Sequence, residues 1–230
     1  MLEALRAEVL EANLELVRRG LVIYTFGNAS GVDRKSGLLA IKPSGVPYDK
    51  MTPEDIVIAD LDGKIVEGKL KPSSDLATHA ALYRAFPTIG GVAHTHSRHA
   101  TAWAQARRDI PCFGTTHADY FHGPVPVTDS LTAQEIEEDY EGNTGVAIIR
   151  RLKGIDPLAC PGALVAGHAP FCWGKNAMEA AHNAVIVEEI AAMAWQTITI
   201  NPEITQISEA MRDKHHFRKH GPKATYGQRA

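Results

Sequence analysis

The sequence predicts an α/β fold in which helices cover a largely antiparallel or mixed sheet. Asp62-Gly63 separates two short apolar segments, 56–60 and 64–67, a pattern typical of a β-hairpin. Apolar residues at helical spacing dominate both ends of the chain, and hairpin signals lie between them. This mixture differs from the regular alternation of a doubly wound parallel sheet. With 230 residues, the chain is long enough to bury a substantial core.

The elements of the N-terminal half follow from apolar spacing and turn residues. A helix is predicted over 2–19, with Gly20 at its C-terminal end. Strands are predicted at 21–24, 38–41, 56–60 and 64–67, and the small polar residues 27–31 are expected to form a loop. Ser73-Ser74-Asp75 is a group of N-cap residues that predicts a helix ending at about Phe86.

The C-terminal half begins with a strand that contains His94 and His96, and a helix over 100–106 follows it. Further strands are predicted at 146–149 and 163–166. A long alanine-rich helix is expected over about 176–198, and a last helix over about 203–219. The remaining residues, 221–228, have an irregular pattern.

Composition excludes several functional classes. Hydrophobic residues make up 44% of the chain and charged residues 22%, and a net charge of −3 gives no reason to expect nucleic acid or a membrane as partner. No segment has the length of a membrane span and the first residues do not resemble a signal peptide, so a cytoplasmic location is expected. Three cysteines without CxxC spacing indicate neither a disulfide framework nor a cysteine zinc site. Eleven histidines are many for this length.

Two of these histidines indicate a metal site. In an extended strand, His94 and His96 point to the same face. His168, in the segment Val165-Ala166-Gly167-His168, is a third candidate ligand. Three histidines around one ion leave a coordination position open, which is typical of a catalytic zinc. The alternative interpretation is a pair of polar residues at the end of a strand.

Three loops share small and hydroxyl-bearing residues that could bind a phosphate monoester. They are Gly27-Asn28, Lys42-Pro43-Ser44-Gly45 and Ser73-Ser74 at a helix start, where free N–H groups and the helix dipole favour an anion. None matches a nucleotide-binding fingerprint, and each alone could be an ordinary turn or cap. Asp75 is a candidate metal contact or base, or else a first-turn acid favoured by the helix dipole.

Two further segments contain candidate proton-transfer groups. Asp119, within 114–120, could act as a general acid or base, or could cap a helix. The C-terminal segment from Lys214 to Tyr226 is either a solvated tail or part of a site in which Tyr226 donates a proton, in its own subunit or in a neighbouring one.

Taken together, the motifs resemble the class II aldolase-like family, which includes the L-ribulose-5-phosphate 4-epimerases, L-fuculose-phosphate aldolase and the head domain of the adducins. They occur in the family's order along the whole chain: Gly27-Asn28, Lys42-Pro43-Ser44-Gly45, Lys71-Pro72-Ser73-Ser74-Asp75, His94-Thr95-His96-Ser97-Arg98-His99, Gly114-Thr115-Thr116-His117-Ala118-Asp119-Tyr120, Gly167-His168-Ala169-Pro170-Phe171 and Lys219-His220-Gly221 through Tyr226-Gly227-Gln228. The resemblance implies a three-layer α/β/α domain over 1–230 with a mainly antiparallel sheet. It also implies a cyclic homotetramer in which residues 221–230 complete a neighbouring subunit's site.

The resemblance assigns roles to individual residues. A zinc ion, or another divalent ion such as Mn²⁺, is expected on His94, His96 and His168, with Asp75 as a ligand or near-ligand. The acid/base pair is expected to be Asp119 and Tyr226, with His215 as an auxiliary group; Tyr226 and His215 are expected to come from the adjacent subunit. Phosphate binding is expected at Gly27, Asn28, Lys42, Ser44, Gly45, Ser73 and Ser74.

Within the family, Asp75 favours an epimerase, since L-fuculose-phosphate aldolase has a glutamate at this position and the shorter side chain draws the carboxylate toward the metal. The expected reaction interconverts L-ribulose 5-phosphate and D-xylulose 5-phosphate at carbon 4 by zinc-dependent retro-aldol and aldol steps. The alternatives are a class II sugar-phosphate aldolase, which would release the aldehyde, and a non-catalytic adducin-like domain, which would lack the metal ligands. Catabolism of arabinose, ascorbate or other pentose sources is the expected context.

Overall fold

The computed structural model describes residues 2–220 together with 224 and 225. Seven strands in this part of the chain form one sheet: β1 (Gly27–Asp33), β2 (Leu38–Ile41), β3 (Val57–Asp60), β4 (Ile65–Glu67), β5 (Gly91–Thr95), β6 (Gly162–Leu164) and β7 (Pro170–Gly174). The α-helices of the same part are α1 (Glu3–Arg18), α2 (Leu76–Ala85), α3 (Arg98–Ala106), α4 (Thr115–Ala118), α5 (Ala133–Arg151), α6 (Ala177–Ile200) and α7 (Glu209–Lys219). Two 3₁₀ helices, Tyr48–Lys50 and Pro53–Asp55, lie between β2 and β3.

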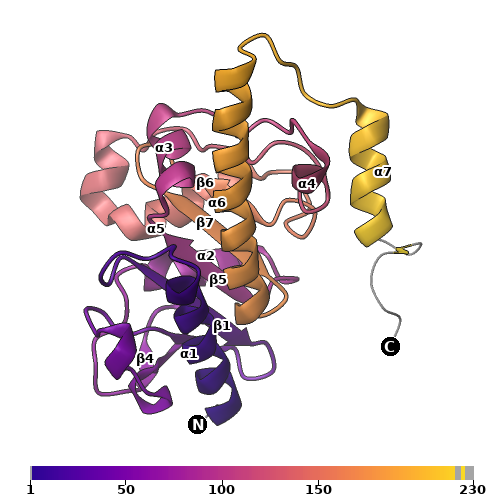
Figure 1. Cartoon of the computed structure of the whole chain (residues 1–230). Coiled ribbons are helices and arrows are strands. Elements are labelled where there is room, and N and C mark those ends of the chain that lie inside the picture. The colour runs from indigo at the N-terminus through magenta and orange to yellow at the C-terminus, as the bar shows by residue number, and fades with distance from the viewer. Residues whose placement is uncertain (1, 221–223, 226–230) are drawn as a thin grey trace.

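Every neighbouring pair of these strands is antiparallel, in the order β4-β3-β2-β1-β5-β7-β6. Helices α1 and α6 pack on one face of the sheet, and α2 and α5 pack together on the other (Figure 1). The predicted α/β fold with a mainly antiparallel sheet is therefore confirmed. The hairpin around Asp62-Gly63 is also confirmed, because β3 and β4 pair antiparallel on either side of this turn.

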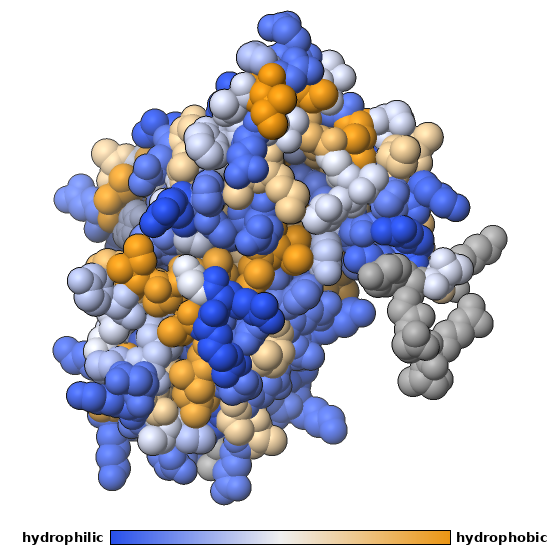
Figure 2. Space-filling view, in the orientation of Figure 1, coloured by the Kyte–Doolittle hydropathy of each residue, from blue (hydrophilic) through white to orange (hydrophobic). Residues whose placement is uncertain are grey.

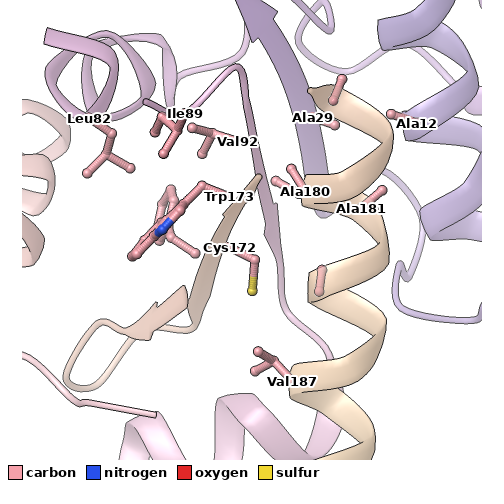
Figure 3. Close-up of a cluster of buried hydrophobic side chains, with 14 of the residues drawn as sticks. Ala12, Ala29, Leu82, Ile89, Val92, Cys172, Trp173, Ala180, Ala181 and Val187 are labelled. Carbon is pink, nitrogen blue, oxygen red and sulfur yellow. The ribbon is translucent and has the colours of Figure 1, made fainter. Parts of the chain in front are cut away.

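Buried side chains pack against both faces of the sheet (Figure 3). Cys172 of β7 faces α6, where Ala180 lies, whereas the next residue, Trp173, faces the side of Leu82 on α2. This alternation follows from the two-residue period of a strand. Both faces at the centre of the sheet are thus removed from water, so any polar side chain there needs a partner or a function.

The strand β1 corrects two predictions. Residues 27–31, expected to be a loop, belong to this central strand, while the strand predicted at 21–24 is reduced to a single bridge between Ile23 and Phe26. The small residues of β1 are there for packing, since α1 approaches closely. A Cβ atom on Gly31 would lie 2.8 Å from a methyl carbon of Leu5 and 3.2 Å from one of Val9.

The prediction of a strand at 146–149 is also wrong, because these residues lie within α5. This helix begins with a capping box, in which Thr132 and Glu135 bond each other's backbone N–H groups. Within 114–120, expected to be a loop, residues 115–118 form the short helix α4. Helix α7 begins at Glu209, after the Ser208 cap, rather than at about 203, and β7 was not predicted.

The other predicted elements are confirmed within a few residues: the first helix, the strands at 38–41 and 56–60, the helix after Asp75, the strand with His94, the helix over 100–106, the strand at 163–166 and the long helix from 176. Over the described ranges, no helix combines the length and apolar content needed to cross a bilayer.

Candidate active site

The sheet places Asn28, His94 and Phe171 in one row across three neighbouring strands. Asn28 of β1 pairs with His94 of β5, and His94 pairs with Phe171 of β7. Paired residues point to the same face of a sheet, here the α2 face, because Ser30, two residues after Asn28, hydrogen-bonds His79 of α2. The His94 ring stacks on the Phe171 ring with centroids 4.1 Å apart. The strand register therefore fixes the first histidine of the site.

His94, His96 and His168 lie together, with one nitrogen of each within 4.8 Å of the others. The centroids of each pair of rings are 4.9 Å apart, and the Nε2 atoms of His96 and His168 are separated by 3.2 Å. Nitrogen ligands about 2 Å from a tetrahedral zinc ion lie about 3.3 Å apart. The three side chains therefore fit a divalent ion and leave a fourth position for another ligand.

These imidazoles are in the form that binds metal. Burial lowers the pKa of His94 and of His96, and burial together with the other two histidines lowers the pKa of His168 to about 4. Neutral imidazole is the metal-ligating form. The His94 Nδ1–H donates to the carbonyl of Pro170 at 2.9 Å, which leaves Nε2 available for an ion.

Asp75 lies beside the three histidines, as the residue that precedes α2. Its Oδ2 accepts a hydrogen bond of 2.6 Å from the Asn28 amide, and its side chain does not cap α2. Burial raises the pKa of this carboxyl, but His94, His79 and the Asn28 amide outweigh that effect and hold the pKa below its ordinary value. Asp75 is therefore an oriented anion next to the histidines, rather than an ordinary acid of the first helical turn.

The structure brings the predicted phosphate-binding loops together. The Ser44 N–H donates to the carbonyl of Lys71 and the Ser73 N–H donates to that of Lys42, both at 2.9 Å. Ser73 also lies against Asp75, and Asp75 is bonded to Asn28. Strand β1 and two loops that are far apart in the sequence thus meet in one polar cluster. Its remaining predicted members are Gly27, buried in the sheet, and Gly45 and Ser74, both exposed.

Lys42 is a cation buried in this group of loops, with only 2% of its surface exposed. Its ammonium group donates to the carbonyl of Pro43 at 3.0 Å and lies 4.7 Å from the centre of the Tyr48 ring. Burial lowers its pKa to about 8. The Tyr48 hydroxyl in turn donates to the carbonyl of Gly27 at 2.6 Å. A buried ammonium whose contacts are neutral groups is suited to an anionic ligand.

Asp119, at the end of α4, is held by residues of α7. Its carboxylate accepts from Nδ1 of His215 at 3.0 Å and from the Arg218 guanidinium at 2.8 and 3.2 Å, and it lies 3.3 Å from the Lys219 ammonium. Burial raises the pKa of Asp119, but these donors outweigh burial and lower the pKa. Asp119 and His215 therefore lie together. The hydrogen bonds of Asp119 lead to α7 and His220 rather than to the three histidines. Tyr226 lies outside the described residues.

One residue at the site was missed by the sequence analysis. The hydroxyl of Tyr140 lies 3.1 Å from Nδ1 of His168. Tyr140 belongs to a segment for which no motif predicts a role, and it reaches His168 only because α5 changes direction at Asp139.

His94 lies in β5, His96 directly follows this strand, and His168 lies in the turn between β6 and β7. An open centre of three imidazoles characterises metal-dependent enzymes rather than structural zinc sites, which saturate the ion with protein ligands. Residues 7–195 match the family model described as class II aldolase and adducin N-terminal domain. The chain belongs to this family.

Individual relatives agree with this assignment. The chain is 53% identical over 228 residues to proteins named L-ribulose-5-phosphate 4-epimerase UlaF from Salmonella paratyphi B and Salmonella typhi, covering 99% of this chain and 100% of each relative. Among solved structures, an L-fuculose 1-phosphate aldolase is similar with a TM-score of 0.78 and 26% identity, over 90% of this chain and 92% of that one.

Proposed function

We propose that this chain is an L-ribulose-5-phosphate 4-epimerase that interconverts L-ribulose 5-phosphate and D-xylulose 5-phosphate. The full-length identity of 53% to relatives with this name carries the proposal. The site supports it, because three neutral imidazoles, an oriented carboxylate and a buried ammonium suit a metal-assisted reaction of a sugar phosphate.

Carbon 4 is not adjacent to the carbonyl carbon, so its hydrogen is not acidic and simple deprotonation cannot invert it. In the proposed reaction, the bond between carbons 3 and 4 therefore breaks and re-forms. His94, His96 and His168 would hold the divalent ion, proposed to be Zn²⁺, with Mn²⁺ as the alternative. When bound, that ion supplies Lewis acidity toward the oxygens of the ketone end of the sugar.

The chain's own residues bind the substrate and move protons. Lys42, residues 27–28 of β1 and the loops at 44–45 and 73–74 would hold the phosphate. The phosphate-bearing fragment of carbons 4 and 5 would then stay bound while its aldehyde group turns. Asp119 and Tyr226 are the proposed acid and base on opposite sides of carbon 4. The lowered pKa keeps Asp119 ionised at neutral pH, which is the form in which a carboxylate can accept a proton.

The assembly is proposed to be a homotetramer with each site shared between two subunits. Because Asp119 is bonded to His215 within one chain, the subunit that supplies His215 also supplies Asp119. We therefore propose that Asp119, His215 and Tyr226 of one subunit act at the three histidines of the next. In this arrangement residues 1–230 form one domain, and residues 221–230 complete the neighbour's site.

Mixed oligomers test the shared site. His96→Asn and Asp119→Asn are each expected to be inactive alone. Random mixed tetramers of the two should regain about a quarter of the wild-type activity, because only an intact histidine centre facing an intact Asp119 works. No recovery in verified mixed tetramers would show that both groups act within one chain.

Product analysis tests the activity itself. With L-ribulose 5-phosphate as substrate, we expect D-xylulose 5-phosphate to accumulate. Carbon NMR of the reaction mixture measures this product. Accumulation of free glycolaldehyde phosphate would instead support the second candidate, a sugar-phosphate aldolase, which the structural similarity to an L-fuculose 1-phosphate aldolase favours. A cytoplasmic location and a role in pentose catabolism, such as arabinose breakdown, complete the proposal.

A further inference from the structure

The two nitrogens of His168 have different surroundings. Nε2 lies 3.2 Å from Nε2 of His96 and points into the three-histidine centre, whereas Nδ1 lies 3.1 Å from the Tyr140 hydroxyl. If Nε2 offers its lone pair to an ion, the ring proton resides on Nδ1, and this Nδ1–H donates a hydrogen bond to the Tyr140 oxygen. His94 has the equivalent support from the carbonyl of Pro170. The Nδ1 atoms of two of the three rings therefore have hydrogen-bond partners outside the metal centre. The partner of His94 is a backbone carbonyl, and the partner of His168 is a side chain.

A break in α5 places Tyr140 at this position. Asp139 has φ −164° and ψ 86°, which interrupt the helix, and its carboxylate accepts a 3.0 Å hydrogen bond from the Gly142 N–H. This bond is an N-cap for the second half of α5, so Tyr140 begins a new helical segment. A Cβ atom on residue 142 would overlap the Asp139 carboxylate, so this cap depends on Gly142.

The second half of α5 is fixed to α2, the helix that follows Asp75. The Thr78 hydroxyl donates to the carbonyl of Glu141 at 2.6 Å. A Cβ atom on Gly145 would lie 2.8 Å from that of Ala81, so the two helices approach very closely. These contacts set the position of residue 140 independently of His168. The contact between Tyr140 and His168 is thus built into the fold and is not a chance meeting of surface side chains.

We propose that Tyr140 is a positioning residue for the metal centre: it fixes the tautomer and the ring orientation of His168 so that Nε2 faces the ion. This inference rests on the proposed metal-binding role of the three histidines, not on the identity of the sugar. Outer hydrogen bonds of this kind typically contribute 10- to 100-fold in metal affinity. Tyr140 is partly exposed, and water can replace its hydroxyl, so we expect the lower end of this range.

The test compares Tyr140→Phe with Tyr83→Phe. Both remove one hydroxyl that makes a hydrogen bond, but the Tyr83 hydroxyl bonds Ser30 in the core. The metal-free proteins are titrated with Zn²⁺ against a competing chelator, and the Co²⁺ forms are examined by visible absorption. We expect Tyr140→Phe to bind Zn²⁺ about tenfold more weakly and to show an altered Co²⁺ spectrum, with Tyr83→Phe unchanged in both.

Gly142→Ala provides a second route to the same contact, because it displaces the Asp139 cap while keeping the tyrosine. It should also weaken Zn²⁺ binding. Wild-type affinity and spectrum in Tyr140→Phe, or equal losses in Tyr140→Phe and Tyr83→Phe, would overturn the proposal. Because these measurements use no sugar, they are independent of the proposed epimerase activity.

Discussion

Replacing Lys42 by methionine should make the protein more stable and impair substrate binding. Burial lowers the pKa of Lys42 from 10.5 to about 8, so the folded protein binds this proton more weakly than the unfolded chain does. The charged ammonium therefore opposes folding wherever it is protonated. This cost is fully present below about pH 8 and disappears as the pH rises toward 10.5. Methionine keeps most of the apolar length of lysine and removes the charge.

The pKa difference corresponds to about 3 kcal/mol at pH 7 and to about 1.4 kcal/mol at pH 9.5. The variant should gain free energy of unfolding by up to these amounts. A charged hydrogen bond to phosphate typically contributes about 1.5–3 kcal/mol, so the KM for the sugar phosphate should rise about 10- to 100-fold. In the wild type, KM should also rise as the pH passes above 8, because Lys42 then loses its proton.

Urea unfolding at pH 7 and pH 9.5, at one protein concentration, measures the change in the free energy of unfolding. Steady-state kinetics at both pH values measure the change in KM. Lys69→Met, at an exposed lysine, is the matched control and should leave KM within twofold of the wild type. A Lys42→Met protein that is less stable than the wild type at pH 7, or that keeps its KM, would refute the reasoning.

Three further predictions concern the metal, the proton transfer and the N-terminal end of α3. His96→Asn should lose both bound metal and activity; metal analysis checks this, and a variant with full metal content would remove His96 from the centre. Tyr226→Phe should keep metal and oligomeric state by light scattering but lose most turnover, so a near-wild-type kcat would exclude the proposed role. The carboxylate of Glu188 accepts hydrogen bonds of 2.9–3.1 Å from the backbone N–H groups of His99 and Ala100. Both residues lie in the first turn of α3, which begins two residues after His96. Glu188→Gln should lower the free energy of unfolding by about 1–2 kcal/mol, and unchanged urea unfolding would contradict this.

Local patterns predicted the elements whose signal lies within a short window of sequence. Apolar spacing identified α1 and α6, and Asp62-Gly63 identified the hairpin of β3 and β4. The prediction failed for β1, where small polar residues resemble a loop in the sequence. Their extended conformation depends on β2 and β5 on either side and on α1 packed above Gly31, and none of these partners is visible in a short window of sequence.

The same distinction applies to the candidate site. The residue types at His94, His96 and His168 and in the segments 27–28, 42–45 and 73–74 were enough to predict a divalent ion and a phosphate as ligands. The geometry of the site came from three long-range features of the fold. They are the strand register that sets Asn28 beside His94, the hydrogen bond between Asn28 and Asp75, and the break in α5 that brings Tyr140 to His168. These contacts join residues 28 to 66 positions apart, and such pairs are fixed by the packing of whole layers rather than by local preference.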